Sequence, residues 1–260
     1  MYASRLLISR LMIYDYTKNM NLIFFLLWGY IMIIGAALGS FLNVVASRLP
    51  LGMSLWGRSR CDSCHQTIKW YDLIPVFSYL FLRSRCRNCK HPIPASHFFF
   101  EIITGALFLF WFYRINWQFT YEHWLLLVLI LVALAIGLAD YYYQVIPDQL
   151  LIVFLIATLL LRFNVLHIFL LGSLLIAFLF WMINHFSHGT AMGYGDVKYV
   201  FVIGLALPLQ SLLLAIYLAF LTGGIVSAIL ILLRKKKMKS TVSFGPFLSL
   251  GFITALCFLI

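Results

Sequence analysis

Charged residues are scarce in this chain of 260 residues: they make up 10% of it, whereas 63% of the residues are hydrophobic. A soluble globular domain usually carries about 25% charged residues, so the composition excludes an ordinary water-soluble domain. Acidic residues are the scarcest, with eight Asp and Glu against nineteen Lys and Arg. In a membrane protein, basic residues gather in cytoplasmic loops. We therefore attribute the basic excess to membrane topology and expect no direct binding of nucleic acid.

Long apolar runs divide the chain into segments that can each cross a bilayer, which takes about 20 residues. The first span is expected at 21–46, after an N-terminal extension at 1–20 and before a polar loop at 47–97. A transmembrane domain follows at 98–260. Its spans are expected near 98–113, 123–139, 147–162, 165–184, 197–209, 211–233 and 243–260. The sequence predicts an all-α polytopic membrane protein with about eight transmembrane helices.

Two basic clusters indicate the orientation of these spans. The loop 47–97 holds eight Lys and Arg residues, and a second cluster lies at 234–239. Both clusters fall on the same side in the order of spans given above, and basic loops lie in the cytoplasm. We therefore expect 140–146 and 185–196 on the cytoplasmic side too, and both termini on the far side. The basic residues that precede the first span oppose this assignment; they are Arg5, Arg10 and Lys18.

Four cysteines in the polar loop form two CxxC pairs, Cys61 with Cys64 and Cys86 with Cys89, separated by twenty-one residues. Two such pairs can complete the four-thiolate shell of a structural zinc ion. Disulfides require an oxidising compartment, which the cytoplasmic assignment opposes, and redox CxxC sites usually sit in a strand-to-helix context that is missing here. We predict a zinc-ribbon-like loop, too small to fold around a core of its own, that the metal stabilises.

Two aspartates lie at the predicted ends of spans, Asp140 after the third and Asp196 before the sixth. A carboxyl group near hydrocarbon is costly and marks a candidate functional site. If the two meet, they share one proton, so that one activates water and the other polarises a peptide carbonyl, as in aspartic proteases. The flanking Gly193 and Gly195 let a backbone approach closely. A proton-coupled transporter would use similar residues.

Asp148 follows Pro147 at a predicted helix start. Proline is tolerated there, and an acidic side chain interacts favourably with the exposed amides of the first turn. From the residues alone, this structural role is the favoured interpretation of Asp148.

Several short motifs follow one another in a fixed order along residues 35–250. The first half contains GSFLNVV at 39–45, RLP at 48–50, the two CxxC pairs, WYDLIPVFSY at 70–79, and Glu101 with Thr104 and Gly105. The second half contains Asp140, the run Ile146-Pro147-Asp148 and the motif Gly193-x-Gly195-Asp196. In this order and spacing the motifs resemble the bacterial prepilin peptidases. The run before Glu101 departs from the usual pattern, because His97 and phenylalanines stand where the family has an Arg-Tyr-Pro-like run.

The resemblance implies a membrane aspartic endopeptidase of the GxGD type in the cytoplasmic membrane of a bacterium. Carried over, Asp140 and Asp196 are the catalytic pair, and Asp148, Gly193 and Gly195 support the site or bind substrate. The substrates would be precursors of type IV pilins or pseudopilins, cut on the cytoplasmic side after a glycine that ends a short basic leader. Many members also methylate the new amino terminus from S-adenosylmethionine. The alternatives are a proton-coupled transporter and a non-catalytic assembly factor of a pilus, secretion or DNA-uptake system.

Overall fold

The computed structural model describes residues 2–190, 192–233 and 242–259, which are almost entirely helical. Over these ranges the only β-structure is two isolated bridges, Arg60 with Thr67 and Arg85 with Pro92. The α-helices are α1 Tyr2–Arg48, α2 Phe77–Phe81, α3 Ala95–Arg114, α4 Tyr121–Tyr143, α5 Asp148–Arg162, α6 Leu166–Phe186, α7 Tyr194–Ala206, α8 Leu209–Leu232 and α9 Gly245–Leu259. Three short 3₁₀ helices complete the set, η1 Leu49–Leu51, η2 Trp70–Leu73 and η3 Phe163–Val165.

Each expected span corresponds to one helix, and the all-α fold class is confirmed. Among the described residues, five stretches are long and apolar enough to cross a membrane: Ile23–Leu51, Ala95–Arg114, Tyr121–Tyr143, Asp148–Phe186 and Leu209–Leu232. The helix α7 is shorter, with a rise of about 20 Å, and the apolar stretch Gly245–Phe258 is also short. The expected number of about eight crossings therefore stays a prediction. The basic cluster 234–239 lies outside the described residues.

The chain divides into two compact units, and the first comprises residues 1–41 and 58–113. It contains most of α1, which begins at Tyr2 and includes the segment assigned above to an N-terminal extension. Small residues let α1 and α3 approach closely. A methyl group on Gly35 would lie 2.6 Å from Phe108 Cβ, and one on Gly39 would overlap the side chain of Thr104. Such glycine contacts are the usual packing device between membrane helices, where lipid is as apolar as the side chains.

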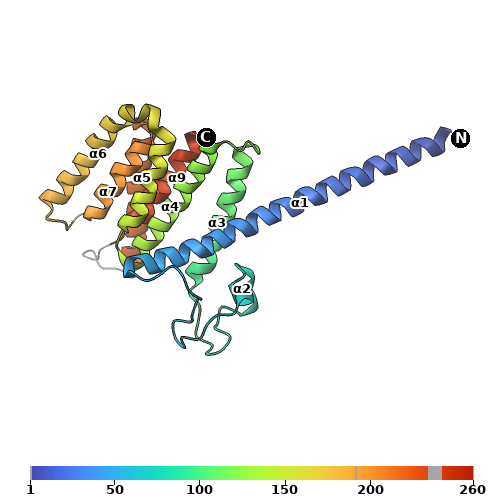
Figure 1. Ribbon diagram of the computed structural model, residues 1–260, viewed down its shortest axis with the longest axis horizontal. Coiled ribbons are helices and arrows are strands. Elements are labelled where there is room, and N and C mark those ends of the chain that lie inside the picture. The colour runs from blue at the N-terminus through green and yellow to red at the C-terminus, as the bar shows by residue number, and fades with distance from the viewer. Residues whose placement is uncertain (1, 191, 234–241, 260) are drawn as a thin grey trace. The chain divides into compact units, whose positions relative to one another are not determined.

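The second unit comprises residues 42–57 and 114–260 and is a helical bundle. Among the stretches long enough to cross a membrane, α4 has the largest buried share; it packs against α5 and α9, and Figure 1 shows these three side by side. In turn α7 packs against α5 and α6, and α8 packs against α9.

Three helices of the second unit meet at a buried cluster of side chains. Phe154 on α5 makes edge-on ring contacts with Tyr199 on α7 and Phe252 on α9. The Tyr199 hydroxyl shares a hydrogen bond of 3.0 Å with the Ser249 hydroxyl on α9. Interhelical hydrogen bonds of this kind contribute about 0.6 kcal/mol each in membrane proteins. This packing fixes α5, α7 and α9 relative to one another, next to the helix ends that carry the acidic residues.

Candidate functional site

Asp140 lies in the last turn of α4, and its side chain is buried, with 6% of its surface exposed. The helix ends three residues later, where Gln144 adopts a left-handed conformation with φ of 54° and donates its backbone N–H to the Asp140 carbonyl at 2.8 Å. A left-handed residue after the last turn is a common helix terminator. Asp140 therefore lies directly before the turn that connects α4 to α5.

Asp196 lies in the first turn of α7 and is 8% exposed. Gly193 is the N-cap, with an extended backbone, and its carbonyl accepts the Asp196 N–H at 3.2 Å. Gly193 does not need glycine's access to positive φ, because its φ is −72°. The first turn of a helix favours a carboxylate, which explains why the chain can hold an acid there.

Gly195 brings the turn between α4 and α5 against the start of α7. A methyl group on Gly195 would lie 3.3 Å from Ile146 Cβ, so a larger residue would push the two segments apart. The sequence predicts that a backbone or side chain approaches Gly195 closely, and in the structure the close neighbour is the Ile146 side chain.

The two carboxyl groups, fifty-six positions apart in the sequence, are close enough to interact electrostatically. Two carboxyls that share a buried site do not ionise together readily, because each charge repels the other. Two acids so placed are a candidate unit that holds one proton between them. This unit can act on a bound group as an acid and as a base in the same step.

A third helix contributes to this site through Gly245, a residue that the sequence analysis missed. The Gly245 N–H, at the start of α9, donates to Asp140 Oδ2 at 2.7 Å. A methyl group on Gly245 would lie 2.7 Å from the same oxygen, so the position admits no side chain without movement of Asp140. The only signal in the sequence is the pair Gly245-Pro246, since proline is favoured in the first turn of a helix.

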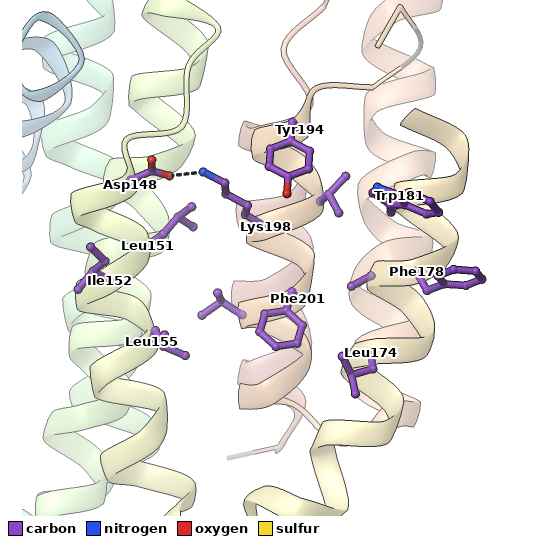
Figure 2. Close-up of a pocket in the computed structure, with 13 residues that line it drawn as sticks. Asp148, Leu151, Ile152, Leu155, Leu174, Phe178, Trp181, Tyr194, Lys198 and Phe201 are labelled. Carbon is purple, nitrogen blue, oxygen red and sulfur yellow. Dashed lines mark hydrogen bonds and ion pairs between the residues drawn. The ribbon is translucent and has the colours of Figure 1, made fainter. Parts of the chain in front are cut away.

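Asp148 begins α5, as expected, and Pro147 precedes it as the N-cap. Its carboxylate accepts from Lys198 Nζ on α7 at 2.8 Å, the contact drawn in Figure 2. Both side chains are partly exposed, and surface ion pairs contribute only about 0.2–1 kcal/mol. The pair links α5 to α7 within one turn of Asp196.

Two tyrosines that follow Asp140 bind the C-terminal part of α1. The Tyr142 hydroxyl donates to Asn43 Oδ1 at 3.1 Å, and the Tyr143 hydroxyl donates to the Ser47 carbonyl at 3.1 Å. Asn43 is itself buried. These contacts brace the α4 end that carries Asp140, and they give a structural reason for the asparagine in the run GSFLNVV.

The four cysteines of the two CxxC pairs come together in the first unit. Their sulfur atoms all lie within 4.8 Å of one another, and Cys61 Sγ is 3.7 Å from Cys89 Sγ. All four are free thiols. Zinc–sulfur bonds of about 2.3 Å in a tetrahedron place the sulfurs about 3.8 Å apart, so the cluster fits a structural zinc ion. No histidine belongs to the cluster as the structure describes it.

The two CxxC pairs have the same local fold. In each, the residue before the first cysteine forms a bridge, and the residue after the second has positive φ, namely His65 at 56° and Lys90 at 59°. Backbone N–H groups of Cys89 and Asn88 donate to the Cys86 sulfur and lower its pKa to about 6. A lowered pKa favours the thiolate, which is the metal-binding form of cysteine.

An ion pair and a carboxylate hold the loop around the cysteine cluster. Arg87 donates two hydrogen bonds to Asp72, at 2.9 and 2.6 Å, and this pair holds the Asp72 pKa below its usual range. On α3, Glu101 Oε2 accepts the Val76 N–H at 2.7 Å, where Val76 has a φ of 64°. A β-branched residue rarely adopts positive φ, so the Glu101 contact compensates for backbone strain.

Comparison with protein families matches both halves of the chain. The family model described as the bacterial peptidase A24 N-terminal domain matches residues 33–115, which include the four cysteines. The model of the type IV leader peptidase family matches residues 127–228, which include Asp140 and Asp196.

Curated relatives extend the match. A protein of Bacillus subtilis is 31% identical over 229 residues, which cover 86% of this chain and 91% of the relative. One of Klebsiella pneumoniae is 35% identical over 210 residues, covering 73% and 91%. One of Myxococcus xanthus is 33% identical over 214 residues, covering 78% of this chain and 63% of the longer relative. All three bear the name prepilin leader peptidase/N-methyltransferase. No solved structure gives a significant match.

Proposed function

Because this chain belongs to the type IV leader peptidase family, we propose that it is a membrane aspartic endopeptidase whose catalytic pair is Asp140 and Asp196. The observation that carries this proposal is the meeting of two buried carboxyl groups, from α4 and α7, that interact electrostatically. Buried carboxyls at helix ends are costly in an apolar protein and are kept where chemistry requires them. Gly193, Gly195 and Asp148 support the pair rather than react.

In this mechanism the ionised member of the pair accepts a proton from a water molecule, whose oxygen attacks the scissile carbonyl carbon. The protonated member donates its proton to the carbonyl oxygen, and a tetrahedral diol forms. The diol then collapses: one of its hydroxyl groups returns a proton to the ionised member, the C–N bond breaks, the leaving amine takes the proton of the other member, and the carboxylic acid product is released. The pair ends with the single proton with which it began. Cleavage therefore consumes only a water molecule.

The substrates that we propose are prepilins or pseudopilins, by analogy with the printed names of the relatives. The cut falls on the cytoplasmic side of a bacterial cytoplasmic membrane, between a short basic leader and an apolar segment. Asp140 and Asp196 lie at the α4 and α7 ends that the charge pattern assigns to the cytoplasm, where such a junction arrives. The basic loop 47–97 would repel a basic leader and is expected to contact anionic lipid headgroups instead.

Two further parts of the proposal concern cofactors. A structural zinc ion would be held by Cys61, Cys64, Cys86 and Cys89, and it would supply folding energy to the loop. A second activity, methylation of the new amino terminus from S-adenosylmethionine, follows only from the names of the relatives.

The test is cleavage of a model prepilin by the purified full-length chain in liposomes, read by mass spectrometry. We expect Asp140→Asn and Asp196→Asn each to lower the cleavage rate by roughly 100-fold or more, since each removes an acid–base group. Glu122→Gln is the matched control: this exposed acid lies at the opposite end of α4 and should leave the rate unchanged. Normal cleavage by either aspartate variant would exclude the catalytic pair.

The same liposomes separate the peptidase from its rivals. A proton-coupled transporter would move protons across the bilayer without cleaving the precursor, and a pH-sensitive dye inside the vesicles would report it. A non-catalytic assembly factor would do neither. Cleavage that depends on both aspartates, without proton flux, is the expected outcome.

A further inference from the structure

Two buried hydroxyl groups join α7 to α9 inside the second unit. Tyr199 on α7 and Ser249 on α9 share a hydrogen bond of 3.0 Å, and their side chains are 0% and 3% exposed. The surrounding interior is mainly apolar. A hydroxyl group that lacks a partner in such an interior is costly, so each of the two groups constrains the position of the other. We call Tyr199 and Ser249 the hydroxyl pair.

The hydroxyl pair lies one helical turn from the proposed catalytic site, on the same helices. Tyr199 follows Asp196 by three positions on α7, and Ser249 follows Gly245 by four positions on α9. Residues three or four positions apart lie on one face of a helix, separated by about 5 Å along its axis. Asp196 therefore shares a face of α7 with Tyr199, and Gly245 shares a face of α9 with Ser249.

The helix α4 contacts α9 at the same two levels. At the first level, Asp140 Oδ2 accepts the Gly245 N–H at 2.7 Å. At the second level, Gly137, three positions before Asp140, packs against Ser249, because a methyl group on Gly137 would lie 3.0 Å from Ser249 Oγ. The hydroxyl pair is thus directly next to the glycine that precedes Asp140 by one turn.

The two aspartates are held against α9 in different ways. Asp140 binds α9 directly, through the Gly245 N–H. Asp196 belongs to α7, so its position relative to α9 depends on how these two helices pack. Apolar contacts are non-directional, whereas a hydrogen bond restricts both distance and orientation. The bond between Tyr199 and Ser249 is such a directional contact, and it lies on the face of α7 that carries Asp196.

We infer that Tyr199 and Ser249 are positioning residues of the proposed peptidase, whose hydrogen bond fixes α7 against α9 and thereby places Asp196 relative to Asp140. The hydroxyl pair acts through the aspartates and takes no part in the chemical step. The inference rests on the proposed function, because it concerns the rate of the cleavage that the two aspartates would perform.

A double-mutant cycle tests this inference with the full-length chain in liposomes and a model prepilin as the substrate. Tyr199→Phe and Ser249→Ala each remove one hydroxyl group and keep most of the packing. We expect each to lower kcat by roughly tenfold with KM within about twofold, because a small displacement of a catalytic group affects the reaction more than binding. The double variant should lose no more than either single variant, because both changes remove the same hydrogen bond.

The folded fraction separates positioning from a loss of stability. Limited proteolysis of the same liposomes measures this fraction, and kcat is expressed per folded molecule. Interhelical hydrogen bonds contribute little to the stability of membrane proteins on average, so the single variants should remain folded. Thr254→Val on α9 is the matched control. The Thr254 hydroxyl donates to two carbonyls of its own helix, at 2.9 Å each, and its removal should leave kcat unchanged.

An unchanged kcat per folded molecule in either single variant would overturn the inference. Losses that multiply in the double variant would overturn it too, since they would indicate two independent effects. If one single variant does not fold, the kcat of the other decides. Cleavage by the unsubstituted chain and its loss in Asp140→Asn report the proposed function separately. Normal cleavage by Ser249→Ala beside an inactive Asp140→Asn protein therefore rejects the hydroxyl pair alone.

Discussion

At the scale of single residues, the proposed site combines acids that the sequence identifies with a glycine that it does not. Asp140 and Asp196 stand out because acids are rare in an apolar chain. Gly245 has no chemistry of its own, and it lies 105 positions after the acid that it contacts. Gly245 contributes a backbone N–H and the absence of a side chain. Neither can be recognised as part of the site from the sequence, because both depend on the packing of α9 against α4.

The Gly245 contact leads to a prediction. Gly245→Ala should lower the cleavage rate on the order of 100-fold, because the added methyl group would displace the Asp140 carboxyl, and small displacements of catalytic groups have effects of this size. The measurement is kcat and KM for a model prepilin, with the loss expected in kcat.

Gly224→Ala on α8 is the matched control, since a methyl group there has no atom within 4 Å. It should leave the rate unchanged. A Gly245→Ala protein that cleaves as fast as its parent would show that Asp140 does not need this position of α9.

At the scale of elements, the start and the end of α7 both differ from the expected span, and the two differences have different causes. The expected span at 197–209 is displaced from α7, which starts at Tyr194 and ends at Ala206. Glycines flank this start, and glycine usually indicates a loop, yet Gly193 serves as an N-cap and Gly195 as a close-packing residue. The helix ends after Ala206 because Pro208 becomes the N-cap of α8.

The cysteine loop is the element for which we propose a bound metal ion. Its short helices η2 and α2 bury no residues, so packing alone contributes little to its stability. The CxxC spacing was sufficient to predict the four-sulfur cluster, because a chain that must present four thiolates to one ion has few other arrangements. The Arg87–Asp72 and Glu101–Val76 contacts, by contrast, depend on the folded path of the loop and leave no pattern in the sequence.

Metal analysis tests this element. We expect about one zinc ion per chain in freshly purified protein, and its loss in Cys64→Ser together with faster proteolysis between residues 58 and 97, because metal binding supplies the folding energy. Cys257→Ser, which removes the fifth cysteine from α9, should keep the zinc. A zinc content near zero in the unsubstituted chain, or an equal content in both variants, would contradict the assignment.

At the scale of the whole molecule, hydropathy predicts the helices but not their neighbours. Each long apolar run became a helix because a chain in lipid must satisfy its backbone hydrogen bonds within the segment. Hydropathy does not predict which helices contact one another. In lipid both the buried and the exposed faces are apolar, so periodicity does not reveal that α4 packs on α9 or that α7 lies between α5 and α6. Hydropathy therefore does not indicate that Asp140 and Asp196 lie close enough to interact electrostatically.

The orientation of the molecule is a prediction that reporter fusions can test. If the basic loops are cytoplasmic, a fusion after Gln118, between α3 and α4, lies on the far side, and one after His188, between α6 and α7, lies in the cytoplasm. Alkaline phosphatase, which needs export, should be active only in the first fusion, and green fluorescent protein should fluoresce only in the second. The two reporters control for each other's expression. The reverse pattern would place Asp140 and Asp196 on the outer face, where a leader still in the cytoplasm could not reach them.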